Sequence, residues 1–236
     1  MQKVCAAIAL VLLAACNRAD APADKLEQAA EDIAETAGVE TPRAPFADGP
    51  FAPRDECSDL DGAREFRQRL AAAVEERDTA GLVALAAEDV KLDFGGGKGR
   101  EELSRRLEAD GSDLWEQLDQ LMILGCDGDR QKGITMPWYY AQDVPGDPMR
   151  MMIVTGESVP VLAQPKADAE IVERLSWEAV PLSRDDQPGQ DFRKIDLGDG
   201  KSGFVTADRL RSVLDYRLQA ISRNGKWSIT SIVRGV

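Results

Sequence analysis

The 236-residue sequence contains no histidine, and this absence excludes several common kinds of catalytic site and metal site. Catalytic sets that use histidine as general base, such as Ser-His-Asp and Cys-His, cannot form from these residues. Zinc sites built on histidine are excluded too, and the four cysteines do not form the cluster that could replace them. We expect no enzyme, no catalytic residue, no metal and no cofactor, although chemistry by carboxylates, lysine or serine stays open.

Basic residues are also scarce. The chain has 29 Lys and Arg against 42 Asp and Glu, a formal net charge of −13. Such a balance argues against nucleic acid as a partner, because binding to phosphates needs a basic surface. Long apolar runs are equally limited. The run Val4–Leu13 is too short for a permanent membrane span, which needs about 20 apolar residues.

The first residues have the features of an export signal. Lys3 supplies a short basic start, the apolar run follows, and Ala14-Ala15 end it, which predicts a removable signal peptide over residues 1–15. Leu13-Ala14-Ala15-Cys16 resembles the lipobox of bacterial lipoproteins. That resemblance implies lipid on Cys16 and a membrane anchor, with Asn17 favouring the outer membrane facing the periplasm over the inner membrane. An ordinary secretory signal with an incidental cysteine is the alternative.

Export bears on the next two features of the chain. Cys57 and Cys126 are an even pair in an exported chain, which predicts a disulfide. Residues 16–55 are rich in proline, alanine and acidic residues and poor in large apolar ones. Such a composition cannot bury enough surface to offset the entropy of ordering, so we expect a disordered tether there.

Residues 56–148 predict a helix-rich α+β region. Apolar residues at helical spacing predict helices over 63–74, from Thr79, around 103–107 and over 112–124, and alternation predicts a strand at 90–94. Ser58 and Asp61 have capping-box form. Two helices, a strand and the turn at 95–99 leading into a helix resemble the start of NTF2-like domains. That resemblance implies a cone that often holds a small ligand.

An aromatic cluster closes this region. Met136–Tyr140 includes Trp138 and Tyr139, which either form part of a strand in the core or stack on a ligand. The sequence favours the core and leaves both residues as ligand-binding candidates.

Residues 149–209 alternate with period two and predict a small all-β unit. The candidate strands are 151–155, 159–162, 171–175, 179–182, 192–197 and 203–205. Their order, and the hairpin through Gly198-Asp199-Gly200, resemble the bacterial SH3 domain, with Phe192 and Phe204 in place of two tryptophans. The resemblance implies an SH3-like β-barrel and makes Trp177, Phe192 and Phe204 ligand-binding candidates. Nearby acids, including Asp185, Asp186 and Asp191, do not match a calcium loop and are interpreted as solvated.

The last part, 210–236, predicts a β-hairpin around Asn224-Gly225, a pair that favours a type I′ turn. We expect this hairpin to pair with strands near 134–140, which would make the barrel an insertion within the first region. The predicted class is therefore α+β: a helical N-terminal region with a few strands, an SH3-like barrel and a C-terminal hairpin.

These features predict a lipid-anchored lipoprotein of the cell envelope. It would act as a non-catalytic binding or scaffold module that contacts peptidoglycan or an envelope protein through the SH3-like unit. The alternatives are an accessory to a cell-wall hydrolase and a small-ligand-binding protein, both using the first region.

Overall fold

The computed structural model describes residues 47–131 and 133–235, and within them the fold is mixed α+β, as predicted. The predicted signal peptide 1–15, Cys16 and residues 17–46 of the predicted tether lie outside the described residues. In the part of the chain that the structure describes, no helix is both long enough and apolar enough to cross a bilayer.

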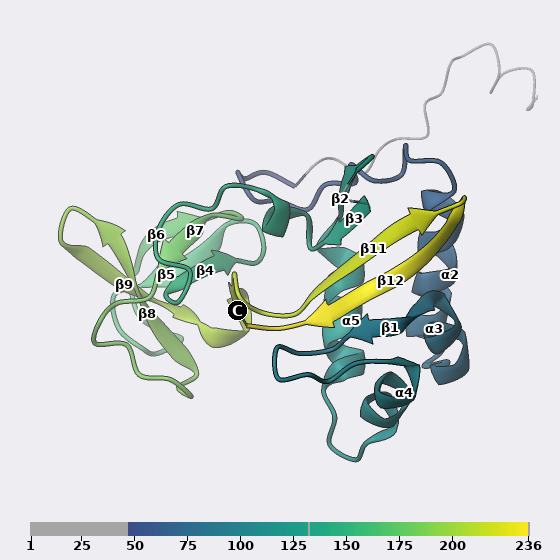
Figure 1. Cartoon of the computed structure of the whole chain (residues 1–236). Helices are drawn as coiled ribbons and strands as arrows, with labels where there is room; N and C mark the ends of the chain where they lie inside the picture. The colour runs from purple at the N-terminus through teal and green to yellow at the C-terminus, as the bar shows by residue number, and fades with distance from the viewer. Residues whose placement is uncertain (1–46, 132, 236) are drawn as a thin grey trace, which may run out of the picture. The chain divides into compact units, whose positions relative to one another are not determined.

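Among the residues that the structure describes, one five-stranded sheet and four helices form the first structural region (Figure 1). The predicted helices are confirmed, and the strand order is β1-β12-β11-β3-β2. The helices are α2 (Ala63–Glu75), α3 (Thr79–Leu85), α4 (Arg100–Glu108) and α5 (Leu114–Ile123). The strands are β1 (Ala86–Lys91), β2 (Asp127–Asp129), β3 (Gly133–Met136), β11 (Arg217–Arg223) and β12 (Lys226–Val233).

Helix α2 is held against the sheet by an aromatic contact. Phe66, Leu70 and Val74 recur at helical spacing and are buried. The Phe66 ring stacks on Trp227 of β12 with 5.9 Å between ring centroids. The Trp227 indole N–H also donates a 2.8 Å hydrogen bond to the Asp61 carbonyl just before the helix. One residue therefore fixes the C-terminal hairpin to the first helix, and Figure 1 shows that hairpin crossing the helices.

The C-terminal hairpin pairs as the sequence predicts. Asn224 (φ 53°) and Gly225 (φ 76°) both have positive φ, which a type I′ turn requires. Strand β11 pairs antiparallel with β3, with Leu218 opposite Met136. Strand β12 also pairs in parallel with β1, which the sequence did not indicate. Because β3 and β11 are neighbours, the chain between them is an insertion in this sheet.

That insertion carries seven strands in two small sheets, ordered β10-β4-β7 and β6-β5-β9-β8. The predicted strands are present, but the hydrogen-bonded strands do not close into a barrel among the described residues: an isolated bridge, Leu182 to Ile195, joins the two sheets. The two sheets share a core that includes Val161, Ile195 and Val205. The strands are β4 (Met151–Val154), β5 (Val159–Leu162), β6 (Ile171–Leu175), β7 (Ala179–Pro181), β8 (Phe192–Gly198), β9 (Lys201–Thr206) and β10 (Leu210–Ser212).

The end of the predicted tether is part of the folded unit, so the predicted boundary at residue 55 is too late. The Phe51 N–H donates to the Trp177 carbonyl at 2.9 Å, and Ala52 is buried. The Cys57–Cys126 disulfide is present, as predicted, with 5.7 Å between the Cα atoms. The backbone at Gly128 lies close to Cys57, and only glycine fits there, because a Cβ at position 128 would lie 2.6 Å from the Cys57 Cα.

Three local predictions for the first region are wrong in detail. The Ser58 hydroxyl bonds Asp55 rather than capping α2, whose N-cap is Gly62. The strand near residue 90 begins at Ala86 and ends before Phe94, whose side chain is exposed. The aromatic cluster leaves the strand after Met136 and continues as the 3₁₀ helix η2 (Trp138–Ala141), because Pro137 has no N–H for the ladder.

Candidate functional site

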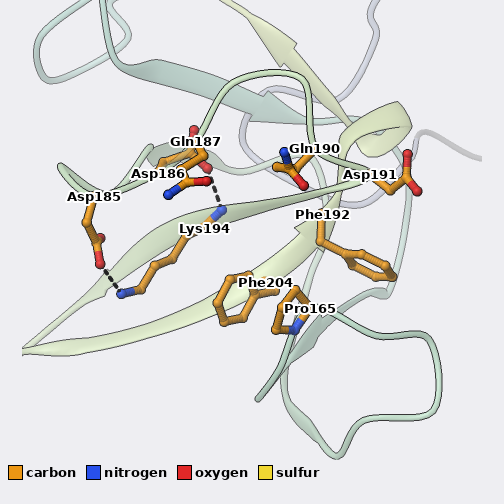
Figure 2. A pocket seen from close by; sticks show the side chains of 9 residues that line it. All are labelled: Pro165, Asp185, Asp186, Gln187, Gln190, Asp191, Phe192, Lys194 and Phe204. Carbon is orange, nitrogen blue, oxygen red and sulfur yellow. Dashed lines mark hydrogen bonds and ion pairs between the residues drawn. The ribbon is translucent and has the colours of Figure 1, made fainter.

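A groove of about 460 Å³ lies over the outward face of the β8–β9 hairpin. Figure 2 shows its side chains: two phenylalanines and a proline on one side, and a polar loop on the other. Its lining residues are Pro165, Asp185, Asp186, Gln187, Gln190, Asp191, Phe192, Lys194 and Phe204.

Strand alternation explains the apolar side of the groove. Lys194 of β8 lies directly opposite Phe204 of β9, and Phe192 is two residues before Lys194, so these three side chains share one face. Ile195 and Val205 point the other way and are fully buried in the core between the small sheets. The two phenyl rings remain partly exposed beside Pro165, as Figure 2 shows. They offer a surface on which an apolar group can stack.

The polar side is a loop held in place by a largely buried ion pair. The Arg193 guanidinium donates two hydrogen bonds, of 2.9 and 2.6 Å, to one oxygen of Asp186, whose side chain is 5% exposed. The Lys194 backbone N–H donates to the other Asp186 oxygen at 2.7 Å. The Ser183 N–H donates to the Lys194 carbonyl at 2.8 Å. Asp186 is therefore a structural residue that positions the loop over β8.

Most charges at the groove are paired. The Lys194 ammonium donates a 2.7 Å hydrogen bond to Asp185, and this bond, with a second from Ser183, lowers the pKa of Asp185. Asp191 differs: its side chain is exposed, and it has no ion-pair partner within residues 47–131 and 133–235. Gln187 and Gln190 of the same loop are also exposed, with amides that can donate and accept hydrogen bonds.

The predicted ligand-binding residues fall into two separate places. Phe192 and Phe204 line the groove. Trp138 and Tyr139 are only 4% and 2% exposed in a second cluster, against which the half-buried Trp177 packs. Burial raises the pKa of the Tyr139 phenol to about 12. Trp138 and Tyr139 are therefore buried core residues of this cluster, away from the groove.

Sequence reasoning missed the polar half of the groove. It weighed Asp185, Asp186 and Asp191 only as calcium ligands, and it gave Gln187 and Gln190 no role. The acidic run Asp185-Asp186 before a strand was the available signal. Nothing in the spacing, however, indicates that Asp186 turns inward to Arg193 while Asp191 stays outside.

Two other groups of reactive side chains serve structural roles. Asp55 Oδ1 lies 3.5 Å from Cys126 Sγ, but a disulfide sulfur is not the thiolate that binds a metal. Glu102 accepts hydrogen bonds from Arg105 at 2.6 Å and from Arg106 at 2.7 Å, which lower its pKa. A general acid at neutral pH needs a raised pKa, so this carboxylate is unsuited to that role.

Comparison of this chain with protein-family models, with curated proteins and with solved structures gives no match.

Proposed function

We propose that this protein is a lipid-anchored lipoprotein of the bacterial cell envelope that binds peptidoglycan, without catalysis, through the groove over β8–β9. The observation that carries the proposal is the pair Phe192 and Phe204, which present partly exposed rings on the outward face of a hairpin whose inward face buries Ile195 and Val205. Half-exposed aromatic side chains beside hydrogen-bonding groups are typical of ligand-binding surfaces.

The inserted strands support a bacterial SH3-like module. Strands β5 and β6, and the hairpin β8–β9, occur where the resemblance to that family places them. Their two sheets share one apolar core. Phe192 and Phe204 stand at the positions that tryptophans occupy in the family's final hairpin, so the resemblance and the groove point to the same two residues.

The sequence and the disulfide support the proposed location. The lipobox-like segment ending at Cys16 would attach the chain to a membrane, and residues 17–46 would provide reach towards the wall. A buried disulfide between Cys57 and Cys126 suits a protein that folds in an oxidising compartment. We favour the outer membrane, facing the periplasm.

Co-sedimentation with purified peptidoglycan tests this function. The full chain, kept in solution with a non-ionic detergent, would be compared with Phe192→Ala and Phe204→Ala. Loss of a stacked ring costs about 1 kcal/mol or more, so each variant should bind roughly five- to tenfold more weakly. Ile171→Ala is the matched control, because Ile171 is an exposed apolar residue of the same sheet, 44% exposed, on edge strand β6.

Wild-type protein that stays in the supernatant at low salt would contradict the proposal and direct the search to an envelope protein partner. Equal loss in Ile171→Ala would place the binding surface outside the groove. Circular dichroism of each variant would show that a loss of binding is not a loss of folding.

A further inference from the structure

We infer that the groove selects a peptide that carries a free primary amine next to an apolar side chain, and that Asp191 receives the amine. This inference rests on the proposed function and adds the chemistry of the ligand. It starts from the charges that the groove leaves unpaired.

The pairing at the groove leaves one carboxylate uncompensated. Asp186 is paired with Arg193, and Asp185 with Lys194, at 2.6 and 2.7 Å between the charged atoms. Asp191 contributes a further negative charge, and no ion pair holds it among residues 47–131 and 133–235. Among the residues that line the groove and their ion-pair partners, three aspartates face Lys194 and Arg193, so one negative charge is left over; the whole chain is also negative, at −13. Anionic ligands are disfavoured, and a cation complements the site.

The position of Asp191 relative to the rings sets the spacing within the ligand. Asp191 directly precedes Phe192, and its carbonyl accepts a 2.8 Å hydrogen bond from the Ala207 N–H, which fixes its backbone at the start of β8. Figure 2 shows its carboxylate close to the Phe192 ring at the end of the groove. A ligand that stacks an apolar group on Phe192 therefore carries its cation only a few bonds away.

The remaining lining residues favour a peptide over a sugar as the carrier of that cation. Gln190 lies next to Asp191 on the loop and Gln187 lies further along it beside Asp186, and the amides of both match the donors and acceptors of peptide bonds. Neutral sugar hydroxyls would leave the Asp191 charge without a counterion. A peptide with a free amine satisfies the apolar rings, the two amides and the carboxylate together.

The test removes each half of the proposed ion pair separately. Peptidoglycan is used untreated and with its free amines acetylated, and the full chain is compared with Asp191→Asn. Because Asp191 is exposed, we expect each change alone to weaken binding about two- to fivefold at 0.15 M salt. The two changes together should weaken it no further than either one alone, since both remove the same contact.

The control is Asp199→Asn, which removes an exposed carboxylate from the β8–β9 turn outside the groove. Its φ of 51° is tolerated by asparagine, so the turn is preserved. Asp199→Asn should bind untreated peptidoglycan as tightly as wild type. An equal loss in this control would show only a general charge effect and overturn the inference.

Further outcomes separate this inference from the proposed function. Sedimentation that depends on Phe192 and Phe204 but is unchanged by acetylation would overturn the amine and leave the proposed function standing. If the loss of binding caused by Asp191→Asn and the loss caused by acetylation add together when both changes are made, the amine binds at another site, and the role of Asp191 is overturned. No sedimentation of wild-type protein with untreated peptidoglycan contradicts both.

Discussion

Reduction of the Cys57–Cys126 disulfide should remove a large part of the protein's stability. The bond joins residues 69 positions apart, and both cysteines are fully buried. In the chain-entropy model, a loop of this length loses about 15 cal/mol/K in the unfolded chain, which is about 4 kcal/mol at 25 °C. Single domains are stable by about 5–15 kcal/mol, so the loss is a quarter or more of the total.

Urea unfolding followed by tryptophan fluorescence measures this loss. Oxidised wild-type protein would be compared with the same protein in excess dithiothreitol and with the double variant Cys57→Ala/Cys126→Ala. The reduced protein keeps its sulfur atoms, so its loss reports the restraint alone, whereas the variant should lose somewhat more because it also leaves small cavities. A loss below about 1 kcal/mol on reduction would refute the reasoning.

Three further predictions concern the first region. Trp227→Phe keeps the ring stack but removes the 2.8 Å hydrogen bond to the Asp61 carbonyl, so the free energy of unfolding should fall by about 1 kcal/mol or more; an unchanged urea midpoint would contradict this. Gly128→Ala should cost about 1–3 kcal/mol because its Cβ would overlap backbone atoms, whereas Gly95→Ala, whose Cβ meets nothing closer than 3.4 Å, should cost much less in the same assay. Asp93 has a pKa lowered to about 2, first by a hydrogen bond from Arg106 of α4. Its stabilising effect is complete above the ordinary pKa near 4 and is lost as pH falls towards 2, so Asp93→Asn should flatten the dependence of stability on pH in that window.

Local sequence patterns predicted the strands and helices but not all of their pairings. Asn224 and Gly225 readily adopt the positive φ values that a type I′ turn requires, so these two residues were enough to predict the hairpin. Strand β1 pairs in parallel with β12, which lies far from it in the sequence. The sequence of β1, Ala86–Lys91, does not alternate cleanly between apolar and polar residues. No short-range pattern encodes such a partner.

The end of the tether shows a second limit. Residues 47–55 have the proline-rich composition of the segment before them, so composition alone assigned them to the tether. Their docking depends on non-local contacts: the Phe51 N–H on the Trp177 carbonyl, and the Cys126 N–H on the Arg54 carbonyl at 2.8 Å. Both partners lie far away in the sequence, so the composition of the segment does not reveal them.

The candidate site was half predictable. Phe192 and Phe204 were predicted from the resemblance of the hairpin to the bacterial SH3 domain, and strand alternation places both on the face away from the buried Ile195 and Val205. The loop residues opposite them depend on the Arg193–Asp186 ion pair, which turns one acid inward and leaves Asp191 outside. Sequence spacing does not distinguish those two acids.

Chemical-shift mapping of the ¹⁵N-labelled protein with soluble peptidoglycan fragments tests the central claim most directly. The account predicts shifts concentrated on the amides of β8, β9 and residues 185–191, with Phe192 and Phe204 among the largest. Shifts confined to the helices and the five-stranded sheet, or no shifts at millimolar fragment, would contradict it.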